Sequence, residues 1–202
     1  MQNTRYVALI AILALSLLPA AAPAAGPQII TACTTITKPG AYVLGQNLTA
    51  TGDCLQIAAD FVTVDFAGFT ITGNKTGEGV TDNNAAHHGI VIRNGVIRTF
   101  RIGIFLFDTT GSVIEHMRVS DNQFDGIDVG SGNLVRSNIA QNNHNGITVS
   151  GGSIVSGNLA LSNENVGIQV GCASNVFENT AANNGVNLQL LGVTCNDTNN
   201  VH

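Results

Sequence analysis

Residues 125–170 read DGIDVGSGNLVRSNIAQNNHNGITVSGGSIVSGNLALSNENVGIQV. The tetrapeptides GIDV, GITV and GIQV begin at Gly126, Gly146 and Gly167, so the stretch repeats every 20 or 21 residues. A fixed period of this length is the signature of a solenoid, in which each repeat packs on the next. The apolar columns that follow the period are Ile114, Val135, Val155, Val176; Val119, Ala140, Ala160, Ala181; Ile127, Ile147, Ile168, Leu188; and Val129, Val149, Val170, Leu190.

The residue types within each repeat indicate strands. Ile and Val stand two positions apart, which is the alternation of a β-strand. The connecting stretches consist of Asn, Ser and Gly, which are poor helix formers, and the leucine offsets of a leucine-rich repeat are lacking. The sequence therefore predicts an all-β, single-stranded parallel β-helix whose strands pair in register with the next turn, ~4.8 Å away. We count about seven turns between Cys54 and Leu190.

Two further columns place asparagine at the corners of the coil, with Met117 as the exception in one of them. Asn tolerates positive φ, and its side-chain amide can bond both the backbone and the identical Asn one turn up. Such stacks would satisfy buried polar groups where the strand ladder stops. The columns are Met117, Asn138, Asn158, Asn179 and Asn122, Asn143, Asn163, Asn184.

The N-terminal residues predict a signal peptide over residues 1–24. Arg5 supplies the positive charge, 7–18 is an uninterrupted apolar run, and 22–24 reads A-P-A, an A-x-A cleavage pattern. The apolar run is short for a transmembrane helix, although an uncleaved anchor is the alternative. We expect a secreted or periplasmic protein without a membrane-spanning segment after cleavage. The mature chain, 25–202, forms one domain with an N-terminal cap over 25–53, coils over 54–190 and a C-terminal cap over 191–202.

The four cysteines suit an oxidising compartment. Cys33 and Cys54 are 21 residues apart, and Cys172 and Cys195 are 23 apart, so each gap is about one turn of the coil. We therefore predict the disulfides Cys33–Cys54 and Cys172–Cys195, one near each end. The rival interpretation is a four-cysteine metal site, but no C-x-x-C motif is present and the two pairs lie far apart along a rod.

The composition argues against several classes of partner. Only 10% of residues are charged and the net charge is −5, whereas nucleic-acid readers carry basic patches. No basic amphipathic helix is present that would bind a membrane surface. Trp is absent, and Tyr42 is the only tyrosine left after signal cleavage, so a sugar site would have to use Phe as its aromatic platform.

The outward position of the GIxV strand gives a row of polar side chains interrupted by one aromatic and one carboxylate. Our candidate catalytic residues are Asp125, Asp128, Arg101 and His144, which fall on three consecutive turns. Arg101 or His144 could act as the base in a β-elimination of an acidic glycan. Asp125 and Asp128, with Cα atoms about 10 Å apart along a strand, could perform an inverting hydrolysis. The row is Gln56, Thr81, Phe105, Asp128, Thr148, Gln169, Gln189, and the candidate substrate-binding residues are Phe105, Thr148, Gln169 and Asn145.

The same side chains also fit a surface without chemistry, because charged residues on an exposed strand face are typical of a solvated surface. Phe105 and Phe107 would point outward beside Asp128, where a sugar, the loop 108–112 or a partner chain could cover them, and self-association through this face is one expectation. On another face, Asp65 and Arg93 occupy equivalent positions of successive turns and predict an ion pair across them.

Three parts of the chain resemble bacterial secreted right-handed parallel β-helix repeat proteins of the pectin-lyase-like superfamily. They are CTTITKPGAYVLGQNLTATGDCLQIAADFVTVDFAGFTITG (33–73), HGIVIRNGVIRTFRIGI (88–104) and the GIxV repeats. The resemblance implies the right-handed fold and its type of N-terminal cap. The superfamily includes pectate lyases, polygalacturonases and phage tailspikes, so one fold hosts many chemistries.

The enzyme motifs of that superfamily are incomplete in this chain. The N-T-D, D-D, G-H-G and R-I-K segments of polygalacturonases are missing. Asp121, Asp125 and Asp128 could be compared with the calcium-binding Asp cluster of pectate lyases, but the surrounding signatures are absent. We therefore expect no cofactor and no metal, with Ca²⁺ as an alternative that no specific motif supports.

Two classes of function therefore stay open. One is a polysaccharide-binding protein, lyase or glycoside hydrolase. The other is a structural or adhesive surface protein without catalytic activity. A groove on which Arg101 and His144 converge would favour the first class, and a flat row with Phe105 and Phe107 exposed would favour the second.

Overall fold

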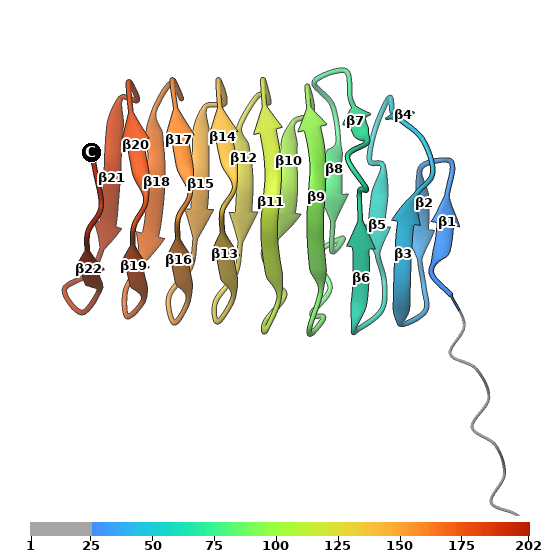
Figure 1. Ribbon diagram of the computed structural model, residues 1–202, viewed down its shortest axis with the longest axis horizontal. Coiled ribbons are helices and arrows are strands. Elements are labelled where there is room, and N and C mark those ends of the chain that lie inside the picture. Colours follow the sequence, from blue (N-terminus) through green and yellow to red (C-terminus); the bar gives the residue numbers. More distant parts are fainter. Residues whose placement is uncertain (1–25) are drawn as a thin grey trace, which may run out of the picture.

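A computed structural model describes residues 26–202 as a parallel β-solenoid, and this part of the chain contains no helix (Figure 1). One strand per turn forms an eight-stranded parallel sheet, here called sheet B, so the solenoid has about eight turns. Seven of these strands lie in the region where seven turns were predicted. The predicted signal peptide lies outside the described residues. The strands of sheet B are β2 (Thr34–Ile36), β5 (Leu55–Ile57), β8 (Glu78–Thr81), β10 (Ile102–Leu106), β12 (Asp125–Val129), β15 (Asn145–Val149), β18 (Val166–Gly171) and β21 (Val186–Leu191).

The rest of each turn forms a fourteen-stranded sheet, sheet A, with two branches. The long strands β9 and β11 run through both branches, and in later turns a break at Ser137 and its equivalents separates them. The first branch is β1 (Gln28–Ile30), β3 (Gly40–Leu44), β6 (Val62–Asp65), β9 (Val91–Arg98), β11 (Val113–Ser120), β13 (Leu134–Arg136), β16 (Ile154–Ser156), β19 (Asn175–Phe177) and β22 (Asn196–Thr198). The second adds β4 (Leu48–Thr49), β7 (Thr70–Thr72), β14 (Ile139–Gln141), β17 (Leu159–Leu161) and β20 (Thr180–Ala182).

The pairing registers confirm the apolar columns. Ile127 pairs with Ile147, Ile147 with Ile168, and Ile168 with Leu188 on successive strands of sheet B. The three isoleucines are fully buried. The Ala140 column is paired in the same way in sheet A. The core is therefore a set of stacked rows that point into the solenoid, and every outward residue has a defined neighbour one turn away.

The asparagine columns form the predicted ladders. Asn138 donates from its backbone N to Asn158 Oδ1 at 3.0 Å, and its Nδ2 donates to the same oxygen and to the Ile114 carbonyl. Asn158 repeats this pattern with Asn179. The expected positive φ is not found at these asparagines; it occurs at the residue before them, such as Ser137. The ladder asparagine can therefore keep an ordinary backbone conformation while its amide bonds the next turn.

A third polar ladder was not anticipated from the sequence. The backbone N of each member donates to the side-chain oxygen of the next, along Ser112, Asn133, Ser153 and Ser174. All four residues are buried at the corner between sheet B and sheet A. Because the column mixes Ser with Asn, it does not stand out as a repeated letter, yet it satisfies the same backbone groups as the asparagine ladders.

Both predicted disulfides are present. Cys33–Cys54 has a Cα–Cα distance of 4.4 Å, and Cys172–Cys195 has one of 4.8 Å. Each bridge joins adjacent turns near one end of the solenoid. The segment predicted as an N-terminal cap also contributes strands that pair with the following turn, namely β1 with β3 and β2 with β5. The ends are thus held both by ladder hydrogen bonds and by a covalent link between neighbouring turns.

Candidate functional site

The pairing register of sheet B confirms the order of the predicted outward row, but Thr81 is buried, with 2% of its surface exposed. Phe105 pairs with Asp128, Asp128 with Thr148, Thr148 with Gln169, and Gln169 with Gln189. Each of these five side chains is half-buried. We call this set (Phe105, Asp128, Thr148, Gln169, Gln189) the sheet B row. It presents one side chain per turn, ~4.8 Å apart.

Asp128 is the least ordinary member of the row. Its Oδ1 atom is buried and has no hydrogen-bond partner among the described residues. Burial of the carboxylate, helped by the negative charges of Asp125 and Asp82, raises the pKa of Asp128 to about 7. At neutral pH this carboxyl is therefore close to half protonated, so it can act either as a donor or as an acceptor toward a ligand.

Asp125 is held by residues of the next turn. Its Oδ1 accepts hydrogen bonds from Asn145 Nδ2 at 3.0 Å and from Thr148 Oγ1 at 2.9 Å. Asp125 and Asn145 are also register partners in sheet B. The structure therefore gathers two candidate catalytic residues and two candidate substrate-binding residues into one cluster of Asp125, Asp128, Asn145 and Thr148.

Arg101 and His144 are engaged elsewhere. Arg101 forms an ion pair with Glu78, whose side chain is almost buried, on the N-terminal side of the cluster. His144 Nδ1 lies 3.1 Å from Glu164 Oε2, on the C-terminal side. Of the four candidate catalytic residues, the structure thus brings together Asp125 and Asp128. Glu78 was not singled out from the sequence because it lies in a long, irregular turn.

A third carboxylate lies next to the cluster. Asp82 follows β8 directly, is fully buried, and accepts hydrogen bonds from the backbone N of Asn84 at 3.0 Å and of Asp108 at 2.9 Å. Burial raises its pKa above that of an ordinary aspartate. Asp82 therefore fixes the turn after β8 to the turn after β10, and its charge adds to the acidic character around Asp128.

The two phenylalanines of β10 and the following turn form an aromatic platform beside this cluster. The Phe105 and Phe107 rings stack with centroids 6.3 Å apart and an interplanar angle of 9°. Phe105 is half-buried, whereas Phe107 has 51% of its surface exposed. The loop 108–112 therefore leaves much of Phe107 uncovered within the described part of the chain.

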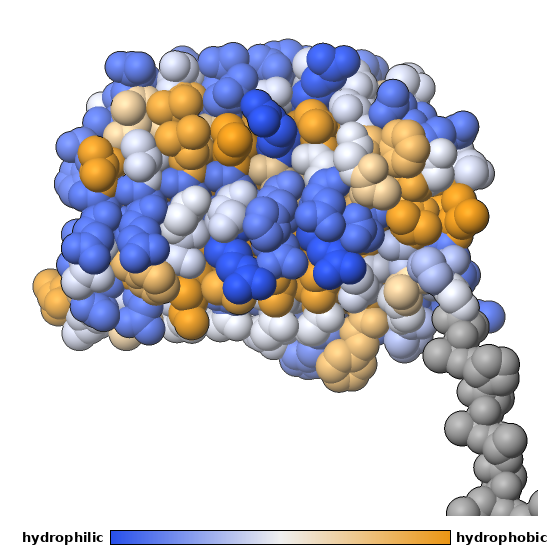
Figure 2. All heavy atoms as spheres, viewed as in Figure 1, coloured by the Kyte–Doolittle hydropathy of each residue, from blue (hydrophilic) through white to orange (hydrophobic). Residues whose placement is uncertain are grey.

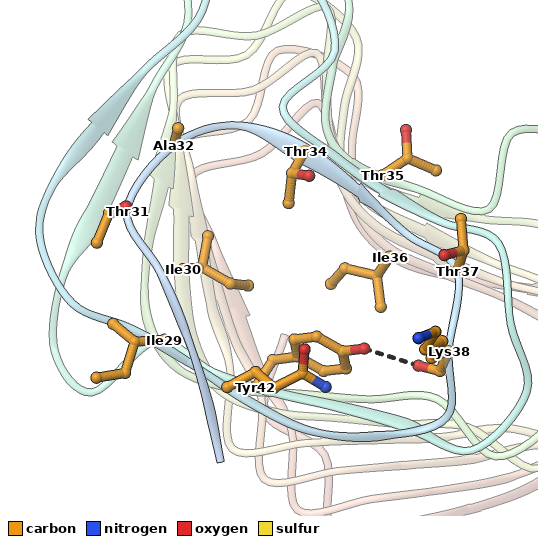
Figure 3. Close-up of a pocket in the computed structure, with 11 residues that line it drawn as sticks. Ile29, Ile30, Thr31, Ala32, Thr34, Thr35, Ile36, Thr37, Lys38 and Tyr42 are labelled. Carbon is orange, nitrogen blue, oxygen red and sulfur yellow. Dashed lines mark hydrogen bonds between the residues drawn. The ribbon is translucent and has the colours of Figure 1, made fainter.

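Two cavities lie away from the cluster. One of about 430 Å³ opens at the N-terminal end of the solenoid, where Ile30, Ile36 and Tyr42 point into the interior and Tyr42 donates to the Lys38 carbonyl (Figure 3). A second of about 210 Å³ lies beside Cys33 and Gln56. Neither includes a candidate catalytic residue. Within residues 26–202, no group of three His, Cys, Asp or Glu side chains is arranged to hold a metal ion.

A family model described as a right-handed beta helix region matches residues 36–186. The chain belongs to this family. Comparison with curated proteins and with solved structures finds no match. The right-handed β-helix family agrees with the fold implied by the resemblance, and it specifies an architecture rather than an activity.

The compartment follows from the covalent structure. Both disulfides are formed, and all cysteines of residues 26–202 take part in them. Structural disulfides of this kind indicate an oxidising, extracytoplasmic location. The described strands and turns include no helix that is long and apolar enough to cross a membrane.

Proposed function

We propose that this protein is secreted and binds a polysaccharide chain along the sheet B row. The observation that carries the proposal is the register of the sheet B row, which sets the half-buried carboxyl of Asp128 next to hydroxyl and amide side chains on successive turns. Because successive strands repeat these groups every ~4.8 Å, the row offers a polymer a periodic series of donors and acceptors. Phe105 and Phe107 add an apolar platform at one end.

The charges favour a neutral glycan over an acidic one. The negative charges of Asp125 and Asp82 both help to raise the pKa of Asp128 on this side of the solenoid. Arg101, the cation that we expected to serve this site, is already paired with Glu78. A uronate polymer would therefore meet carboxylates without a compensating cation, which is unfavourable in a partly buried site.

The same geometry gives no support to a lyase mechanism. A β-elimination needs a base beside an acidic sugar, and the two candidate bases, Arg101 and His144, hold Glu78 and Glu164. If the site also hydrolyses its glycan, Asp128 is the proton donor, because a carboxyl with a pKa of about 7 stays protonated in about half of the molecules at neutral pH.

The test is a binding and activity screen on the mature protein. Neutral glycans, polygalacturonate and alginate are compared by affinity electrophoresis, with new reducing ends and absorbance of unsaturated product measured in parallel. We expect retention on a neutral glycan that is lost in Asp128→Ala and weakened in Gln169→Ala. Thr198→Ala, an exposed strand residue of β22 in sheet A, is the matched control and should bind as the parent does. Absence of binding across the whole panel contradicts the proposal.

A second candidate is a structural or adhesive protein without a glycan site, and the half-exposed Phe107 favours it. In that case Phe107 would be the anchor of a contact with another protein. Cell-surface adhesion would then fall in Phe107→Ser and remain unchanged in Gln169→Ala. The opposite pattern, with Gln169→Ala as the damaging change, supports glycan binding.

A further inference from the structure

The first branch of sheet A presents a second ordered face, far from the sheet B row in each turn. Its strands align outward side chains in two rows that run along the solenoid. The central row is Ile29, Val43, Asp65, Arg93, Glu115, Arg136, Ser156, Phe177 on β1, β3, β6, β9, β11, β13, β16 and β19. The flanking row is Ala41, Thr63, Val91, Val113, Leu134, Ile154, Asn175 on β3 to β19. Figure 2 looks onto this side and shows hydrophilic side chains in the middle of the view with hydrophobic ones below them.

The middle of the central row alternates in charge. Asp65 accepts from Arg93 at 3.0 Å, which confirms the ion pair predicted from the sequence, and Glu115 pairs with Arg136 at 2.6 Å. The order along the solenoid is therefore negative, positive, negative, positive. The arginines are the more exposed partners, with 41% and 49% of their side chains accessible against 25% and 12% for the carboxylates. The guanidinium groups of Arg93 and Arg136 are therefore accessible to a second ionic contact.

This order is self-complementary when a second copy is laid against it in the opposite direction. A two-fold axis parallel to the strands, passing between β9 and β11, places Arg93 opposite Glu115 of the second copy. It also places Asp65 opposite Arg136 of the second copy. Each contact occurs twice, as a two-fold interface requires. A parallel arrangement would instead oppose Asp65 with Asp65 and Arg93 with Arg93.

The same two-fold rotation also sets several apolar side chains opposite each other. Ile29, which is 70% exposed, falls opposite Phe177 at the two ends of the central row. In the flanking row Val91 falls opposite Val113, and Ala41 falls opposite Ile154, which is 41% exposed. Apolar residues therefore meet apolar residues at these three positions. Val43 falls opposite Ser156 and Thr63 opposite Leu134, so the match is partial, and Thr198 on β22 extends the central row beyond it.

We propose that a second copy of this chain packs antiparallel on this face and forms a two-fold symmetric dimer. Asp65 and Glu115 cancel the charges of Arg93 and Arg136, so a generally acidic or basic partner gains no net attraction here. The order of the charges is useful only to a partner with the reversed order, and an identical face supplies it. The interface is independent of the sheet B row, which stays open in the dimer.

The expected affinity follows from the size of the face. Eight strands at ~4.8 Å and two outward rows cover roughly 40 by 12 Å, or about 500 Å² per copy. About 1,000 Å² in total lies at the low end for specific interfaces. We therefore expect an equilibrium between monomer and dimer that shifts with protein concentration.

The first experiment is sedimentation velocity over a wide concentration range, at low and at high salt. The parent should shift from monomer to dimer as its concentration rises. The double variant Glu115→Arg with Arg136→Glu keeps an internal ion pair with reversed polarity, but it sets like charges against each other at all four central contacts. It should stay monomeric, with circular dichroism to verify that it is folded. A parent that remains monomeric throughout, or a folded double variant that dimerises like the parent, overturns the proposal.

Two further variants test the apolar ends without altering the charges. Ile29→Glu should weaken the dimer at least tenfold. Val193→Glu is the matched control, because Val193 is 99% exposed and lies outside both rows, and it should dimerise as the parent does. Equal loss in both variants, or loss only in Val193→Glu, contradicts the proposed face.

Cross-linking tests the antiparallel direction itself. Ala41→Cys and Ile154→Cys lie five strands apart in one chain, or ~24 Å, but face each other across the proposed interface. A short bis-maleimide that spans the ~10 Å between packed sheets should give a covalent dimer with the double variant, or with a mixture of the two single variants, but not with either single variant alone. Equally efficient dimer formation by Ala41→Cys alone would indicate a parallel arrangement and would falsify this one.

Discussion

The C-terminal and the N-terminal halves of the solenoid differ in how their successive turns are held together. From β12 to β21 the turns repeat every 20 or 21 residues, and each position makes the same contact as its equivalent one turn away. From β5 to β10 the turns are longer, and individual residues such as Asp82 and Glu78 hold them. The regular half thus supplies the scaffold, and the unusual carboxylates gather where the irregular half meets it.

The largest expected effect is on the regular half. Ile168→Asp would place an unpaired charge inside the stack, where Ile168 is fully buried, and it should prevent folding. The measurement is the far-UV circular dichroism of the purified protein. Gln169→Asp, at the neighbouring outward position, is the matched control and should fold. A folded Ile168→Asp would mean that the regular half tolerates more than its packing implies.

The asparagine ladder should respond less strongly. Asn158→Ala removes the side-chain Nδ2 that donates to Asn179 Oδ1 and to the Val135 carbonyl, and it removes the Oδ1 acceptor used by Asn138, while the backbone N of residue 158 still donates to Asn179. Because each buried group that loses its partner costs about 1–3 kcal/mol, we expect a loss on the order of 3–5 kcal/mol in the free energy of unfolding. Urea unfolding measures it. Replacement of the exposed Asn142 by Ala should cost far less, and equal costs would refute a special role for the ladder.

At the boundary between the halves, stability should depend on the ionisation of Asp128. The folded-state pKa of about 7 lies above the ordinary 3.8, so the folded protein binds more protons between these values and loses stability as the pH rises from about 4 to about 7. Asp128→Asn removes this loss. It should be nearly neutral at pH 4 and stabilising by on the order of 3–4 kcal/mol at pH 8, given about 1.4 kcal/mol per pKa unit. A stability difference that does not change with pH contradicts the burial of this carboxylate.

The smallest of these effects concerns the ends. Removal of Cys33–Cys54 or of Cys172–Cys195 by paired Cys→Ala substitutions should cost roughly 2–4 kcal/mol each, since each bridge closes a loop of about one turn. Hydrogen exchange should show the affected end opening first. Unchanged melting and uniform exchange would indicate that the ladder hydrogen bonds alone hold the terminal turns.

The regular half could be predicted from the sequence because repetition exposes its contacts. Ile147 and Asn143 each recur in a column, and both the inward position and the ladder follow from that recurrence. The two disulfides could be predicted for the same reason, because each gap between paired cysteines is about one turn long. The Ser112 ladder could not be predicted from the sequence because Ser and Asn share its column, although the side-chain oxygens of both accept a hydrogen bond from the preceding turn.

The candidate site was only partly predictable. The sheet B row follows from the strand register, so the neighbourhood of Asp128 and Thr148 could be deduced. The engagement of Arg101 by Glu78 could not, because a long side chain at a corner can turn toward either neighbouring turn. The position of Asp82 near the site could be inferred, because it directly follows Thr81 of the predicted row. Its hydrogen bonds could not be inferred, because they depend on the path of a loop that has no repeat.

The ladders have a consequence for the length of the molecule. In the regular half each turn forms hydrogen bonds only with the turn before it and the turn after it. No contact in that half therefore depends on the total number of turns. Deletion of residues 146–166 would join Asn145 to Gly167 and leave each column intact. Such a chain would be one turn, or ~4.8 Å, shorter. Duplication or loss of single turns during evolution could therefore change the length of the solenoid, and with it the length of its binding surface, without any change in the packing of the core.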